Sequence, residues 1–124
     1  MSFEKPVLVQ SLPAAADLST AGQYRAVKGD GAGAMVLAGA GELALGVCQN
    51  NPSLNQTGTY MSEGVSKMVA GGSFAEGDVL AADASGNAVV AGSGDFPIGT
   101  ALQASGGAGE IRAVKLDITL TPRA

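Results

Sequence analysis

Two stretches of the chain, residues 30–48 and 83–101, are diverged copies of one another and align without a gap. Seven of the nineteen aligned positions are identical. Each copy runs from an Asp-x-x-Gly turn through a short apolar strand and a glycine loop to an aliphatic residue followed by glycine. Such a duplication predicts a fold built from two matching β units. It carries no chemistry of its own, so function has to be argued from other features.

Short apolar runs separated by glycine turns predict an all-β chain. About nine short strands at intervals of roughly 8–12 residues are typical of a β-sandwich or a small barrel. Glycine interrupts the chain too often for long helices. The expected strands are residues 23–28, 35–38, 43–48, 59–61, 65–69, 79–81, 88–91, 98–102 and 114–120.

Two of these strand assignments leave alternatives open. Residues 59–61 and 65–69 flank Glu63-Gly64 and form either one bent strand or a hairpin. From Val114 to Leu120 large apolar residues alternate with polar ones, which indicates one buried and one solvated face. Ile111 and Ala113 lie in the opposite phase, so either a bulge lies near 113–114 or the segment is two strands.

The first twenty residues differ from the rest of the chain because they contain two prolines and no glycine. They predict an extended N-terminal arm, residues 1–20, followed by a single β domain, residues 21–124, that holds the internal repeat. Residues 11–18 are compatible with a short helix capped by Ser11. The expected fold is therefore a duplicated meander with an arm and at most one or two short helices.

Composition excludes several classes of partner. The net charge is −4 and the seven Lys and Arg residues are scattered, so we expect no nucleic-acid ligand. A single cysteine allows no disulfide within the chain and indicates synthesis in the cytoplasm. No apolar run is long enough for a signal peptide or a membrane span. With 19 glycines and 4% aromatics the core is lean, which favours stabilisation by a partner subunit or surface.

The residues needed for most enzymes are missing. The chain has no His and one Cys, which excludes His acid–base catalysis, Cys–His nucleophiles and His or Cys metal sites. We expect no enzymatic activity, no cofactor, no metal and no small-molecule substrate. Cys48 is interpreted as a small buried hydrophobe. Two acid pairs are conceivable, Asp78 with Asp83 and Glu42 with Asp95, but acids beside glycine favour local turn hydrogen bonds.

Two further surface features allow alternative readings. Residues 49–56 form an amide-rich loop, which either binds a glycan or a protein neighbour or is simply solvated. Its candidate residues are Gln49, Asn50, Asn51, Asn55 and Gln56. Arg25 and Arg112 each open an identical Arg-Ala-Val-Lys run. They are either interface contacts or exposed charges that discourage aggregation at strand edges.

Several segments, taken in order, resemble the small head decoration, or capsid cement, proteins of tailed bacteriophages. The resemblance covers nearly the whole chain, although each piece alone is a weak glycine-turn pattern. The segments that carry it are residues 14–18, 22–28, 45–50 with Pro52, 64–67, 75–80, 83–86 and 98–102.

The resemblance implies a non-enzymatic virion protein located on the outer surface of the mature capsid. Such a protein binds the major capsid protein, usually as a homotrimer, and stabilises the shell against internal DNA pressure. A head-fibre or other virion surface module that binds a glycan or the host surface is the alternative. We expect the backbone of the N-terminal arm to be unpaired within the chain, so that the arm contacts the capsid or a neighbouring protomer by adding to a sheet edge. Its candidate contact residues are Phe3, Pro6, Val7, Leu8, Val9 and Leu12.

Overall fold

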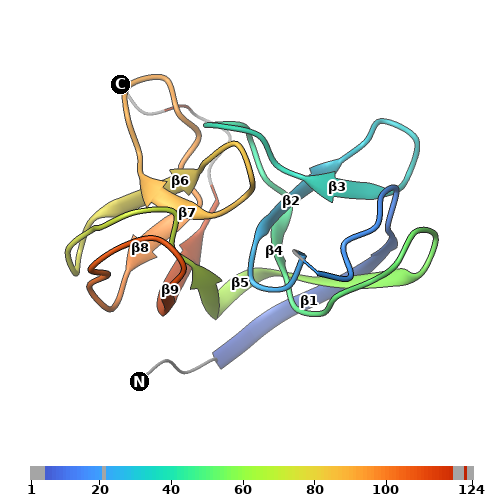
Figure 1. The fold of residues 1–124 in the computed structure, drawn as a ribbon, viewed down its shortest axis with the longest axis horizontal. Helices are drawn as coiled ribbons and strands as arrows, with labels where there is room; N and C mark the ends of the chain where they lie inside the picture. Colours follow the sequence, from blue (N-terminus) through green and yellow to red (C-terminus); the bar gives the residue numbers. More distant parts are fainter. Residues whose placement is uncertain (1–4, 21, 119–121, 123–124) are drawn as a thin grey trace.

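The computed structural model describes residues 5–20, 22–118 and 122, and within them the chain forms strands and no helix. The predicted all-β class, a small barrel or sandwich, is confirmed. Figure 1 shows two lobes joined by one long strand that runs between them. The strands are β1 (Lys5–Pro13), β2 (Ala26–Gly29), β3 (Met35–Leu37), β4 (Gly46–Cys48), β5 (Thr57–Val69), β6 (Val79–Ala82), β7 (Ala88–Val90), β8 (Gly99–Ala101) and β9 (Ile111–Asp117).

The long strand β5 belongs to both lobes. The sheet order is β3-β2-β4-β5-β9-β8-β6-β7, and β1 pairs with the remaining edge of β5. In the first lobe Ala14, directly after β1, bridges to Met35 of β3, so strands β1 to β5 curl into a small barrel. In the second lobe Ala70, directly after β5, bridges to Ala88 of β7, so strands β5 to β9 close in the same way. We call these the first barrel and the second barrel.

The strand registers show that the two barrels match position by position. In the first barrel Pro13 of β1 pairs with Thr57 of β5, and in the second Val69 of β5 pairs with Ile111 of β9. The pairings of β2 with β3 and β4 recur in those of β6 with β7 and β8. Strand β5 therefore closes the first barrel with its N-terminal half and opens the second with its C-terminal half.

Matching positions also fill the two interiors. The first barrel is packed by Ala14, Leu18, Val27, Met35, Cys48 and Tyr60. The equivalent residues Ala70, Phe74, Leu80, Ala88, Ala101 and Val114 are all buried in the larger cluster of the second barrel. The larger cluster also contains Ala26, Val47 and Met61 from the first barrel. One continuous apolar cluster thus connects the second barrel to the first.

Strand β5 decides between the two alternatives left open for residues 59–69, one bent strand or a hairpin. Residues 59–61 and 65–69 lie in a single strand, Thr57–Val69, and not in a hairpin. Gly64 has a φ of 113°, which lets the strand continue past Glu63-Gly64 from one barrel to the other. The conceivable short helix at residues 11–18 is not formed, because Ser11 to Pro13 complete β1 and pair with Thr59 to Thr57.

Strand β9 contradicts both alternatives that the sequence left open, a bulge near 113–114 and two separate strands. Residues 111–117 pair with β5 in an unbroken register, and Val114 and Leu116 pair with β8 without a shift. The phase change arises because Ala113 and Val114 are both fully buried, so the strand is covered on both faces at this point. The predicted continuation through residues 119–120 lies outside the described residues.

Candidate interaction surfaces

The N-terminal arm is a strand of the first barrel. Its backbone, expected to be unpaired, pairs antiparallel with β5 from Lys5 opposite Val65 to Pro13 opposite Thr57. Two register irregularities lie between Pro6 and Leu8 and between Leu8 and Val9. The expectation of an unpaired arm is corrected for this reason: one of the two edges of β1 is already used within the chain.

The second edge of β1 faces away from β5. The N–H of Ala14 donates to the carbonyl of Gln56, and the Ala14 carbonyl accepts from the N–H of Asn55. Alternation along an antiparallel pair then directs the backbone groups of Leu12 and Gln10 toward β5, and those of Ser11 and Val9 outward. Ser11 and Val9 are also exposed at their side chains. They form an open strand edge, which we call the outer edge of β1.

In the second barrel the strand edge equivalent to the outer edge of β1 is covered by other parts of the chain. There the equivalent strand is the C-terminal half of β5, and Val65 on its edge pairs with Lys5 of β1. Further along, the Val69 N–H donates to the Tyr24 carbonyl at 3.0 Å. At the position equivalent to Val69 the first barrel carries Pro13, which has no N–H. Prolines at Pro6 and Pro13 bracket the outer edge of β1 and limit strand addition to a short segment.

The predicted arm residues are distributed unevenly over this surface. Val9 is 44% exposed, whereas Leu12 is half-buried and packs against the interior of the first barrel. The backbone of Pro6, Val7 and Leu8 lies in β1. Phe3 lies outside the described residues. Among the candidates with a described side chain, Val9 is the one that presents apolar surface to a partner.

The amide-rich loop, residues 49–56, is held by its own side chains. Gln49 Nε2 donates to the Ser66 hydroxyl at 3.0 Å, and Asn50 Oδ1 accepts the Thr59 N–H at 3.0 Å. Asn51 Oδ1 accepts from the N–H of Gln23, and Gln56 Oε1 accepts from the N–H of Ser53. Four of the five predicted recognition amides therefore fix the loop. Asn55 adopts a φ of 67° at the exposed end of the loop.

The four acids that were considered as catalytic pairs, and Asp30 as well, are turn residues. Asp30 Oδ1 accepts from the N–H groups of Ala32 and Ala34, and Asp83 Oδ1 accepts from those of Ser85 and Asn87. The remaining three acids each accept one local backbone bond: Glu42 from Gly39, Asp95 from Gly92 and Asp78 from Ala75. Glu42 also forms an ion pair with Lys28. The interpretation as turn chemistry accounts for all five carboxylates.

These turn bonds predict a loss of stability in acid. Hydrogen bonds from the N–H groups of Ala32 and Ala34 lower the pKa of Asp30 below its ordinary value of 3.8. The resulting stabilisation is complete above the unfolded pKa and is lost as the pH falls through the lower folded pKa. We expect the melting temperature to drop between about pH 5 and pH 2.5, and less steeply in Asp30→Asn, whose amide oxygen accepts the same bonds uncharged. Parallel melting curves for the two proteins over this range would contradict the assignment.

Cys48 and the two arginines have structural partners. Cys48 is fully buried in β4, at the position that Ala101 takes in the second barrel, and burial raises the pKa of its thiol. Arg25 Nε donates to Asn87 Oδ1 at 2.8 Å and so links the two barrels. Arg112 pairs with Glu110 at 2.6 Å and donates to the Ala104 carbonyl. Both arginines are half-buried, so the interpretation as exposed edge charges was wrong.

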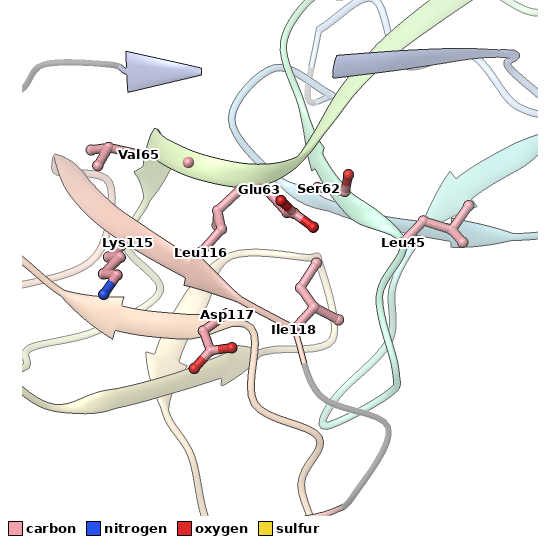
Figure 2. A pocket seen from close by; sticks show the side chains of 9 residues that line it. Leu45, Ser62, Glu63, Val65, Lys115, Leu116, Asp117 and Ile118 are labelled. Atoms are coloured by element: carbon pink, nitrogen blue, oxygen red, sulfur yellow. The ribbon is translucent and has the colours of Figure 1, made fainter. Parts of the chain in front are cut away.

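A groove of about 610 Å³ lies at the seam between the two barrels. Figure 2 shows side chains from β5, from the end of β9 and from the approach to β4 around it. Leu45 is 38% exposed, and Glu63, Lys115 and Asp117 are also exposed. The Ser62 hydroxyl oxygen is buried without a hydrogen-bond partner among the described residues. The lining residues are Leu45, Ser62, Glu63, Gly64, Val65, Lys115, Leu116, Asp117 and Ile118.

Sequence reasoning missed this groove. Its walls come from three segments that become neighbours only because β5 runs through both barrels. The sequence did contain one signal, since Glu63 and Asp117 take equivalent positions in the two closing strands β5 and β9. That equivalence lies outside the gap-free repeat and requires the strand registers to be seen.

Within the described ranges, no group of three or more Cys, Asp or Glu side chains is placed to hold a metal ion. The same part of the chain contains no helix long and apolar enough to cross a membrane.

Comparisons with known proteins concern both the family and the fold. A family model described as phage cement protein matches residues 12–117. Among solved structures, the chain is similar to the N base of head fiber gp8.5 in bacteriophage phi29, with a TM-score of 0.69 and 19% identity over 89% of this chain and 95% of the other. At that identity the likeness shows the fold alone. No curated protein sequence matches.

Proposed function

The chain belongs to the phage cement protein family, and from this membership we propose that it binds the major capsid protein on the outer surface of the mature head as a homotrimer. The family is one of structural virion proteins that decorate and stabilise the capsid. The observation that carries the proposal is the extent of the match, residues 12–117, which covers both barrels apart from most of β1. The lean interior of the barrels supports a protein that gains stability from a larger assembly.

Stabilisation of the shell follows from differential binding. A protein that binds the mature shell and not the loosened one favours the mature state by RT ln(1 + [L]/Kd) at each site. At a free concentration of 100 Kd this amounts to about 2.7 kcal/mol per site. Many such sites on one head add up, so modest contacts per copy suffice.

The outer edge of β1 is the surface we propose for the capsid or protomer contact. Its outward backbone groups at Val9 and Ser11 can extend the sheet of the first barrel by one strand from a neighbour. The exposed Val9 side chain adds apolar contact area. Of the predicted arm residues, Val9 therefore carries the side-chain contact, and Pro6 limits how far the added strand extends.

Imaging of decorated heads tests the function. Purified protein mixed with phage heads that lack it is expected to produce ordered density at threefold positions of the outer surface. The decorated heads are expected to release DNA at a higher temperature than undecorated ones. Absent or randomly placed density would overturn the proposal.

A head-fibre component is the second candidate, favoured by the similarity of the fold to the base of a head fibre. Recognition of a glycan by loop 49–56 gains no support from the structure, because four of its five candidate amides hold the loop together. Density that extends outward from the capsid as a fibre, in the same imaging experiment, would favour this candidate.

A further inference from the structure

The groove between the barrels combines two kinds of surface. One part of its lining is apolar, formed by Leu45, Leu116 and Ile118. The other part carries the carboxylates of Glu63 and Asp117. In Figure 2 the Glu63 carboxylate is drawn between Leu116 and Leu45, above Ile118. An apolar wall beside an acidic end matches a long side chain with an aliphatic stem and a cationic head.

Glu63 and Asp117 carry the same charge at paired positions of the sheet. Glu63 of β5 pairs with Asp117 of β9, so the two side chains leave the same face of the sheet from directly opposite positions. Like charges at such positions destabilise a sheet. The ion pairs found among the described residues are Lys28 with Glu42 and Arg112 with Glu110, and neither involves these two acids. Lys115 is the cation among the lining residues. It lies two residues before Asp117 on β9 and pairs with Val65 of β5.

We propose that the groove binds a lysine or arginine side chain of the major capsid protein, with its charged head between Glu63 and Asp117 and its stem against Leu45 and Ile118. This inference rests on the proposed function. A cation placed between the two acids offsets their charge, which makes the site favour a cationic partner over a neutral one.

Strand β5 separates the groove from β1. Val65 in the groove wall pairs with Lys5, and Glu63 pairs with Leu8. The N-terminal end of β1 therefore lies one strand away from the acidic part of the groove. The groove and the outer edge of β1 lie on opposite sides of the β1–β5 pair, so they are two separate contact surfaces.

Neutralising both acids tests the proposal. In the double variant Glu63→Gln, Asp117→Asn, we expect affinity for heads that lack the protein to fall by about tenfold to a hundredfold at low salt. Salt weakens charge-assisted binding, so the affinity of the variant is expected to depend less on ionic strength than that of the wild type. The free variant is expected to melt at the same or a slightly higher temperature, because the like-charge pair is gone.

The control is Glu76→Gln, which removes one exposed carboxylate from a turn outside the groove. This variant is expected to bind heads like the wild type. A second groove variant, Leu45→Ala, removes part of the apolar wall at a 38% exposed position, and its affinity is expected to fall about threefold to tenfold. Wild-type binding by the double variant would overturn the groove proposal and leave the capsid function standing. Failure of the wild type itself to bind heads would overturn both.

Discussion

Replacing Gly99 with alanine is expected to lower the free energy of unfolding by about 3 kcal/mol. A Cβ added at this position would overlap the backbone carbonyl oxygen of Lys115, on the neighbouring strand β9. Backbone in the middle of a sheet cannot move aside as a flexible side chain can. The same reasoning applies to Gly46, where a Cβ would overlap the Met61 carbonyl oxygen on β5. The two glycines occupy equivalent positions in the repeat.

Equilibrium unfolding in urea measures the effect, and Gly29→Ala is the matched control. Gly29 also lies in a strand, β2, but no atom comes within 4 Å of a Cβ built on it. Its replacement is expected to be neutral or to stabilise by up to about 1 kcal/mol, because alanine loses less chain entropy than glycine on folding. Equal stabilities for Gly99→Ala and Gly29→Ala would contradict the close approach of β8 to β9.

The shared strand makes a further prediction for the same experiment. Since β5 closes the first barrel and opens the second, neither barrel is complete without it. We propose that the chain unfolds as one cooperative unit, so that Gly46→Ala and Gly99→Ala shift a single transition to lower urea. Two separate transitions, each sensitive to one of the variants, would show that the barrels fold independently.

The order of strands could be predicted from the sequence, because turn chemistry is local. Asp30 with Gly33, and Asp83 with Gly86, specify the same turn twice, and the apolar runs that follow can only be strands. The position of Cys48 as a small buried residue was also predictable from its apolar strand. These features depend on neighbours within a few residues.

Features that depend on pairing between residues far apart in the chain could not be predicted from the sequence. The role of β5 in both barrels is fixed by its registers with β1 and β9, which no local pattern encodes. The arm looked unpaired because its partner strand lies more than forty residues away, as in the pairing of Pro13 with Thr57. The amide loop looked like a recognition surface because sequence cannot tell an amide that binds a partner from one that bonds to its own backbone.

Proline at Ser11 is expected to abolish the capsid contact while the protein stays folded. The Ser11 N–H points away from β5, so its loss removes a donor from the outer edge of β1 and leaves the pairing between β1 and β5 intact. Affinity for heads that lack the protein is expected to fall at least about tenfold, since one backbone hydrogen bond is lost and the proline ring blocks a strand from approaching. The melting temperature is expected to change little.

The neighbouring substitution Leu12→Pro separates the two edges of the strand. The Leu12 N–H faces β5, where Leu12 pairs with Gly58, so proline there breaks a bond inside the first barrel and is expected to cost about 3 kcal/mol of stability. Deletion of residues 2–12 would remove most of β1 and cannot distinguish folding from binding. If Ser11→Pro decorated heads as well as the wild type, the outer edge of β1 would not be the contact surface. The capsid would then have to be bound elsewhere, and the groove at the seam of the two barrels offers an independent attachment point.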